Sequence, residues 1–206
     1  SVVRHIVYGK GRIAYETFDA PAGEHDTLRL SFTPTRLTAD GRRLPRLGGL
    51  HRNGFTVEPL DCGDCIVRIR HDGRTRIAIE GHDPQTEVDD ASLDYAGRWG
   101  VSVDVKDRSG GVHIASEAGA SVEIPFTGNQ VRVIGRTGPT GGRADVYLDG
   151  EKQLAIVDAH SPRTMHRQVL YSASGLAQGP HTLRLAATGD GNPLSLGADV
   201  AIDAVQ

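Results

Sequence analysis

The sequence has few cysteines, lysines, aromatic residues and long apolar runs, and each shortage excludes something. Two cysteines cannot supply two Cys-x-x-Cys pairs for a structural zinc ion. No apolar run approaches the roughly 20 residues that span a bilayer, and no signal-peptide pattern opens the chain. The formal net charge is −3, with three lysines beside twenty arginines, so no overall field favours nucleic acid or an anionic membrane. We therefore expect neither as a partner.

Glycine is abundant, at 26 of 206 residues, and it punctuates short runs in which apolar and polar residues alternate. Examples are TLRLSF (27–32), CIVRIRHDG (65–73), RTRIAIEG (74–81), QVRVIG (130–135), ADVYLDG (144–150), HTLRLAAT (181–188) and DVAIDAV (199–205). A period of two with Gly, Asp and Pro between runs predicts antiparallel strands. No stretch of twelve or more residues has a helical period. The predicted fold class is all-β, with two antiparallel β-sandwich or jelly-roll-like units.

The polar, acid-rich segment EGHDPQTEVDDASLDYAG (80–97) separates two β patterns and predicts a domain boundary. We expect a first unit over residues 1–84 and a second over 85–206. The first is small for an independent sandwich, so it either packs on its neighbour or closes a larger β domain. Asp40-Gly41 and Asp149-Gly150 each predict a tight hairpin turn. The chain opens directly on SVVRHIVYG, so it is either cytoplasmic or a mature or excised piece of a larger protein.

Cys62 and Cys65 form a C-x-x-C pair whose spacing fits a redox site, half a zinc site or a local staple in a turn. The pair flanks Gly-Asp between two strand-like runs and opens no helix that would lower a thiol pKa. We favour a local disulfide or paired thiols across a hairpin turn. A disulfide would place the chain outside the cytoplasm.

The glycine-rich segment GRTGPTGG (135–142) is a candidate phosphate loop by composition only. It lacks the Lys-Ser/Thr ending of such loops, contains Pro139 and runs into a strand. We interpret it as a hairpin loop. The chain also lacks the G-x-S-x-G and H-E-x-x-H motifs, and local context singles out no pair of catalytic carboxylates.

Four ordered blocks in residues 88–206 resemble the galactose-binding-like β-sandwich, a carbohydrate-binding type of module that is appended to secreted bacterial carbohydrate-active enzymes. The blocks are VDDASLDYAGRWG (88–100), GASVEIPFTGNQVRVIGRTGPTGGRADVYLDGE (119–151), QVLYSASGLAQGPHTLRL (168–185) and GADVAIDAVQ (197–206). Residues 1–84 resemble, only in the general character of their sequence, β domains that flank the catalytic domains of such enzymes. The resemblance implies a secreted or cell-surface protein whose ligand is a polysaccharide or oligosaccharide.

The same resemblance suggests a structural calcium ion, since sandwich modules of this type often hold one. Asp89 and Asp90, with Asp94 nearby, could join Asp203 as oxygen ligands. A solvated acidic linker is the alternative interpretation of these residues. Asp203 is the unusual member, because it interrupts an apolar strand and a buried acid needs partners.

Candidate sugar-binding residues are aromatic side chains and polar donors in loops. A flat aromatic face suits the apolar face of a sugar ring, and Arg donates two parallel hydrogen bonds. The candidates are Tyr95, Trp99, Arg136, His160, Arg163 and His166. A core position for Trp99 and a solvated connection at 158–168 are the alternatives.

We therefore predict a non-catalytic carbohydrate-binding accessory region of a secreted polysaccharide-degrading enzyme, with a linked or associated catalytic domain as partner. Its role would be to hold substrate near that domain. One alternative is a structural or assembly β module without a ligand. Another is part of a glycoside hydrolase or polysaccharide lyase whose active site another chain completes.

Overall fold

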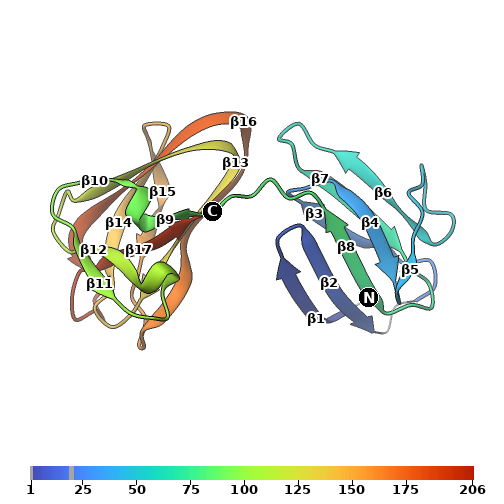
Figure 1. Ribbon diagram of the computed structural model, residues 1–206, viewed down its shortest axis with the longest axis horizontal. Coiled ribbons are helices and arrows are strands. Elements are labelled where there is room, and N and C mark those ends of the chain that lie inside the picture. Colours follow the sequence, from blue (N-terminus) through green and yellow to red (C-terminus); the bar gives the residue numbers. More distant parts are fainter. Residues whose placement is uncertain (1, 19–20) are drawn as a thin grey trace. The chain divides into compact units, whose positions relative to one another are not determined.

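The computed structural model describes residues 2–18 and 21–206, and the chain divides into two compact units, Ser1–Gln85 and Thr86–Gln206 (Figure 1). Both are built of antiparallel strands, and the described residues form no α-helix, only two three-residue 3-10 turns. The all-β prediction is confirmed. Nowhere in the described chain is there a helix long and apolar enough to span a bilayer.

The described residues of unit 1 form eight strands in two sheets. The strands are β1 (Val2–Gly9), β2 (Arg12–Phe18), β3 (Asp26–Leu30), β4 (Pro34–Ala39), β5 (Arg42–Arg43), β6 (Gly54–Pro59), β7 (Cys65–Arg70) and β8 (Arg76–Gly81). Five of them form a sheet in the order β1-β2-β8-β4-β5, and three form a second sheet in the order β3-β7-β6. Because β8 inserts between β2 and β4, the last strand of the unit lies at the centre of the larger sheet.

Alternating side chains of the two sheets build one core between them. Val67 and Ile69 of β7 are fully buried and pack in the same cluster as Ile77 and Ile79 of β8. These are the alternate apolar residues of the runs CIVRIRHDG and RTRIAIEG, where the strands that the period of two predicts are confirmed. The residues between them on β7 and β8 are partly exposed or exposed. The larger sheet therefore has one face in the core and one face in solvent.

The segment DCGDC forms the turn between β6 and β7, as a hairpin prediction requires. The Leu60 N–H donates to the Asp64 carbonyl at 2.8 Å, and Gly63 adopts a positive φ of 88°. The predicted disulfide is wrong, because no S–S bond joins Cys62 and Cys65, both within the described chain. The two sulfur atoms have different partners. Cys65 Sγ donates to the Phe32 carbonyl at 3.3 Å inside the core, and Cys62 Sγ accepts from Arg29 Nη2 at 3.4 Å.

We expect both cysteines to react with a thiol reagent without prior reduction, at different rates. Cys65 is 2% exposed, and burial raises its pKa, so little thiolate is present at neutral pH. Cys62 is partly exposed and should react first with a thiol reagent in the native protein. Cys65 should react only after unfolding. A protein that shows no thiol until a reductant is added would contradict this arrangement.

Unit 2 contains the remaining strands in one large antiparallel sheet. They are β9 (Val88–Asp89), β10 (Asp94–Ala96), β11 (Gly100–Val103), β12 (Gly111–Ala115), β13 (Ser121–Thr137), β14 (Gly142–Leu148), β15 (Glu151–Asp158), β16 (Met165–Gly191) and β17 (Val200–Val205). The order is β11-β12-β17-β13-β16-β14-β15, while β10 pairs with β13 and β9 pairs with β17. The long strands β13 and β16 run beside each other and bend over the core (Figure 1).

The core of unit 2 follows the alternation of its strands. Val122 and Ile124 of β13 are almost fully buried and pack with Leu183 and Leu185 of β16. Val200 and Ile202 of β17 join the same cluster. Every residue of β17 is buried, so this strand is covered on both faces.

The turn predictions are also confirmed. Asp40-Gly41 joins β4 to β5 and Asp149-Gly150 joins β14 to β15, with positive φ at all four residues, as a type I′ hairpin turn requires. The segment 135–142 connects β13 to β14 and opens no helix, but the hairpin-loop interpretation is wrong, because β16 lies between these two strands in the sheet. A Cβ on Gly142 would lie 2.1 Å from the Ala198 carbonyl oxygen, so glycine serves close backbone packing there.

Candidate functional site

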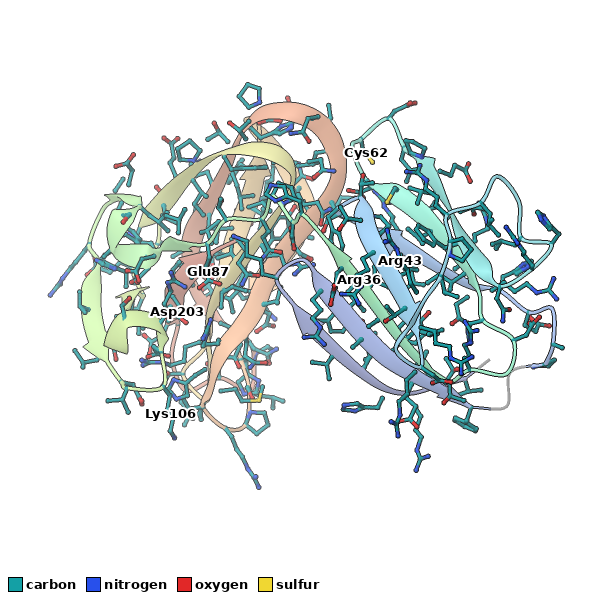
Figure 2. All side chains as sticks on the ribbon, turned by 45° about the vertical axis from the view of Figure 1, so that its right-hand side comes forward. Arg36, Arg43, Cys62, Glu87, Lys106 and Asp203 are labelled. Atoms are coloured by element: carbon teal, nitrogen blue, oxygen red, sulfur yellow. The ribbon has the colours of Figure 1, made fainter. Side chains whose placement is uncertain are left out.

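Asp203 of β17, labelled in Figure 2, lies close enough to the charged side chains of Asp107, Arg167 and Asp90 for each to affect its pKa. Asp203 is fully buried, and its Oδ1 accepts a hydrogen bond from the Arg108 backbone N–H at 2.8 Å. Its Oδ2 has no hydrogen-bond partner among the described residues. Burial is the main cause that raises the pKa of Asp203, and the negative charge of Asp107 adds to the effect. The strand thus holds an acid that is costly to ionise where it lies.

Asp107, in the loop between β11 and β12, binds an arginine and a histidine side chain from two other strands. Its side chain is fully buried and pairs with Arg136 of β13 and with His166 of β16, whose Nδ1 donates at 2.6 Å. Arg136 also donates to Ser102 Oγ at 3.0 Å. The structure therefore brings together two of the predicted sugar-binding residues, Arg136 and His166, on a carboxylate that sequence analysis did not single out.

We call Asp107, Arg136 and His166 the Asp107 network. At its outer part, His166 Nε2 and the Asp104 carboxylate remain able to form further hydrogen bonds. His166 Nε2 lies 3.7 Å from Asp104 Oδ2, which is too far for a hydrogen bond. The Lys106 backbone N–H donates to Asp104 at 3.0 Å and is the main cause that lowers the pKa of this carboxyl, so Asp104 stays an ionised acceptor. Val103 and Val105, which flank Asp104 in the sequence, are 81% and 92% exposed. A ring nitrogen, a carboxylate and apolar surface are what a sugar hydroxyl and a sugar ring face require.

Tyr95 and Trp99 also lie together, but their rings and polar groups contact other residues of the protein. Their ring centroids are 4.7 Å apart, and Tyr95 stacks on His113 at 4.5 Å. The Trp99 indole N–H donates to the Ala96 carbonyl, and the Tyr95 hydroxyl donates to the Asp90 carbonyl. Both rings are partly buried against the core of unit 2. This packing supports the interpretation of Trp99 as a core residue.

The remaining acids of the cluster are held by Arg108. Its guanidinium pairs with Glu87 and lies 3.4 Å from Asp89 Oδ2. Asp89 also accepts from the Ser109 hydroxyl at 2.5 Å. One arginine thus supplies a side-chain cation to two carboxylates and, through its backbone, a donor to Asp203.

The residues proposed for calcium do not form a calcium site as the structure places them. Asp90 accepts from the backbone N–H and the Nδ1 of His113, at 2.7 and 2.6 Å. Asp89 is engaged by Ser109 and Arg108, which leaves Asp203 Oδ2 as the unsatisfied oxygen of the three acids. Across the described residues, no group of three or more His, Cys, Asp or Glu side chains is arranged to hold a metal ion. Calcium takes six to eight oxygens, and this arrangement does not offer them.

His160 and Arg163 lie outside the network. His160 donates its backbone N–H to Asp158 at 3.1 Å, and Arg163 is exposed in the connection from β15 to β16. The residues that sequence analysis missed are Asp104, Asp107 and Arg108 in the loop DVKDRSG (104–110). The feature of the sequence that could have identified them is a polar, acid-containing loop between two short strands. The sequence does not reveal the partners of this loop, because one of them, Asp203, lies 95 residues away from Arg108 along the chain.

Comparison with known proteins finds sequence similarity to about half of the chain. The chain is 36% identical over 96 residues to an "A type blood N-acetyl-alpha-D-galactosamine deacetylase" of Flavonifractor plautii, covering 47% of this chain and 12% of that protein. It is 34% identical over 108 residues to an "A type blood alpha-D-galactosamine galactosaminidase" of the same organism, covering 50% of this chain and 10% of that protein. The chain thus matches about a tenth of the length of these relatives.

Structural similarity is weaker. The CBM36-1 domain of a multidomain xylanase from the hindgut metagenome of Trinervitermes trinervoides aligns with a TM-score of 0.39 and 17% identity, covering 58% of this chain and 93% of that domain. No protein-family model matches the chain. What these comparisons establish is that part of this chain is similar in sequence to segments of two much longer carbohydrate-active enzymes.

Proposed function

We propose that this chain is a non-catalytic carbohydrate-binding region of a carbohydrate-active enzyme, with a galactose-binding-like sandwich over residues 85–206. The similarity to the two Flavonifractor plautii enzymes carries the proposal, because both are named for galactosamine-type sugars. The match covers 12% and 10% of those proteins, which is the size of an accessory domain. The ligand class is a galactose-configured sugar, with or without an amino or acetamido group.

The sugar contact lies at the outer part of the Asp107 network. Asp104 accepts hydrogen bonds from sugar hydroxyls, and His166 Nε2 offers a second polar group 3.7 Å away. Arg136 and Asp107 hold the imidazole in place, since Asp107 accepts from His166 Nδ1 at 2.6 Å. The exposed Val103 and Val105 supply apolar surface beside the polar pair. The biochemical effect is tethering, in which a modest-affinity site raises the local concentration of substrate at a linked catalytic domain.

Isothermal titration calorimetry of the whole chain with galactose, galactosamine, N-acetylgalactosamine and their oligosaccharides tests this proposal. The variant His166→Ala should weaken binding by about tenfold, the loss of one polar contact. His160→Ala is the matched control, because His160 lies in the same connection but outside the network. Equal affinity of the two variants, or no binding of any sugar by folded protein, would refute the assignment.

A secreted or cell-surface location belongs to the same proposal, because polysaccharide substrates lie outside cells. Cys62 and Cys65 lend it no support, since no disulfide joins them in the described structure. The sugar-binding test above does not depend on this location.

A further inference from the structure

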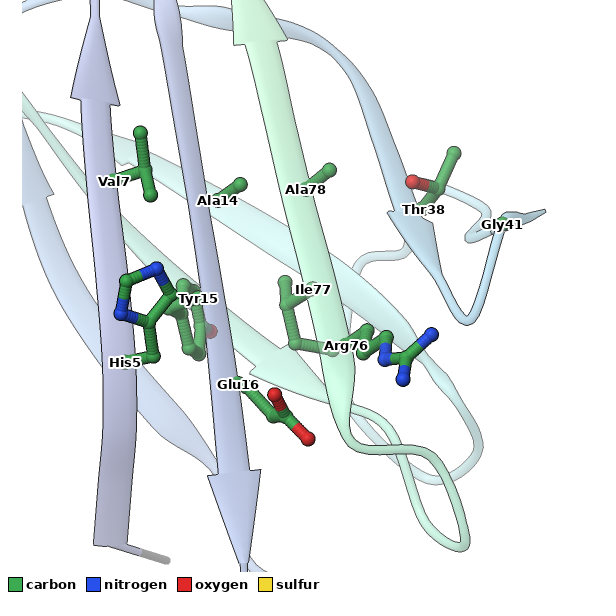
Figure 3. A pocket seen from close by; sticks show the side chains of 10 residues that line it. All are labelled: His5, Val7, Ala14, Tyr15, Glu16, Thr38, Gly41, Arg76, Ile77 and Ala78. Atoms are coloured by element: carbon green, nitrogen blue, oxygen red, sulfur yellow. The ribbon is translucent and has the colours of Figure 1, made fainter.

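The solvent face of the larger sheet of unit 1 holds a groove of about 330 Å³ (Figure 3). It lies entirely within unit 1 and crosses β1, β2, β8 and β4. Its lining includes His5, Val7, Glu16, Thr38, Arg76 and Ala78. None of these residues belongs to the network in unit 2, and sequence analysis singled out none of them.

The floor of the groove is one row of small or apolar side chains. Val7 lies opposite Ala14, Ala14 opposite Ala78, and Ala78 opposite Thr38 on four neighbouring strands. Two alanines at the centre of the row leave a hollow in the sheet surface (Figure 3). Strands lie about 4.8 Å apart, so four of them span about 14 Å, which is long enough for a short oligosaccharide.

Charged rows lie two residues away along the strands, on both sides of this floor. On one side His5, Glu16 and Arg76 lie opposite one another on β1, β2 and β8. On the other side Arg12, Glu80 and Arg36 lie opposite one another on β2, β8 and β4. All six share the solvent face with the floor, because side chains two residues apart point the same way. The apolar floor thus has hydrogen-bonding groups along both edges.

The groove itself is lined by one arginine and one glutamate, Arg76 and Glu16, beside His5, and the residues that border it add more positive than negative charge. The two rows and the end of the floor hold four arginines and two glutamates: Arg12, Arg36, Arg43, Arg76, Glu16 and Glu80. Arg43 lies opposite Thr38 at the end of the floor. Glu80 is paired with Arg36 at 3.5 Å. Within the described chain, the Arg76 guanidinium makes no ion pair or hydrogen bond. An arginine without a protein partner beside an apolar floor is a ready donor to a carboxylate.

We propose that this groove is a second ligand site that binds an oligosaccharide carrying carboxylate groups, such as one built of uronic acid units. The proposal takes its ligand class from the proposed function of the chain and adds a site and a charge to it. A sugar ring places its apolar face on Ala14 and Ala78, its hydroxyls meet Thr38 and Glu16, and its carboxylate meets Arg76. A peptide adding as a strand has no access here, because β2 and β8 are each paired on both sides within the sheet.

The test is calorimetric titration of the whole chain with a tetragalacturonate and with a neutral galactose tetrasaccharide. The acidic ligand should bind more tightly, and its affinity should fall as salt is added. Arg76→Ala should weaken its binding by about tenfold, and Arg76→Glu by more, while circular dichroism stays unchanged. Arg68→Ala is the matched control, because Arg68 is an arginine on β7 of the other sheet of unit 1, in an exposed ion pair with Glu58.

The variant His166→Ala separates this inference from the proposed function. If the groove binds the acidic ligand, His166→Ala should leave that binding unchanged, since His166 belongs to unit 2. Binding that His166→Ala abolishes and Arg76→Ala leaves intact would place the ligand in unit 2 and overturn the groove site, while the proposed function would stand. Equal affinity of the acidic and neutral ligands would also overturn it.

Discussion

Replacing Asp26 by alanine is expected to lower the free energy of unfolding of unit 1 by about 3 kcal/mol, the loss seen when a buried polar network loses its central acceptor. Asp26 Oδ2 accepts from the Tyr15 hydroxyl at 2.8 Å and lies 2.8 Å from His71 Nε2. Tyr15 and His71 are 5% and 4% exposed, so water cannot replace the lost partner. For a unit of this size the melting temperature should fall by more than about 10 °C.

The single tryptophan makes this measurement selective. Trp99 belongs to unit 2, so its fluorescence follows unit 2 while circular dichroism follows both units. Asp26→Ala should lower the melting temperature of the unit 1 transition seen by circular dichroism and leave the transition seen by tryptophan fluorescence unchanged. Asp61→Ala, an exposed change in the turn between β6 and β7, is the control and should be nearly neutral. If Asp26→Ala melts like that control, the buried network does not stabilise unit 1.

The same network makes the stability of unit 1 depend on pH. His71 Nδ1 lies 2.6 Å from the Arg74 carbonyl, and Nε2 faces Asp26, so both ring nitrogens act as donors in the charged form. The hydrogen bond to Asp26 is the main cause that raises the pKa of His71. A raised histidine pKa gives stability that is fully present below the unfolded value, about 6.5, and is lost as pH rises through the folded-state pKa. His71→Gln should remove this slope, and a slope that persists in that variant would have another origin.

Replacing Asp107 by alanine is expected to destabilise unit 2 by about 3–5 kcal/mol, as removal of one partner of a buried ion pair does. The Asp107 side chain is fully buried and binds both Arg136 and His166. Arg136 is only 16% exposed, so the substitution leaves a guanidinium largely out of water without its carboxylate. The loop between β11 and β12 would also lose its ties to β13 and β16.

Chemical unfolding followed by Trp99 fluorescence measures this change, because the tryptophan lies in the affected unit. Asp107→Asn keeps the shape and one acceptor oxygen and should cost less than alanine. Asp94→Ala, an exposed acid on β10, should leave the midpoint within experimental error of the unaltered protein. An Asp107→Ala midpoint equal to that of Asp94→Ala would show that the ion-pair network contributes nothing measurable.

Local rules predicted much of the fold. The period of two placed Val67, Ile69, Ile77 and Ile79 in a core, and both Asp-Gly pairs formed the turns that their residues favour. The glycine-rich segment 135–142 opens no helix, as expected of a segment without the Lys-Ser/Thr ending of a phosphate loop. These features depend on neighbours within a few residues, and that is why the sequence reveals them.

The Cys62–Cys65 pair shows what local spacing cannot predict. The spacing predicted a turn, which is present, but the orientation of each sulfur depends on residues far along the chain. Cys65 meets Phe32, and Cys62 meets Arg29, both contributed by the segment at β3. A C-x-x-C spacing carries no information about such partners.

By itself the sequence determined the class of the fold, the inner faces of the strands and the tight turns, because alternation and turn chemistry act over short distances. The tertiary structure alone decided which charges meet. Strand order joins Asp107 to Arg136 and His166 from three parts of the chain, and Arg108 to Asp203 across 95 residues. The insertion of β8 between β2 and β4 likewise aligns Ala14, Ala78 and Thr38 into one groove floor. Pairing between distant strands sets these contacts, and no local pattern in the sequence encodes it.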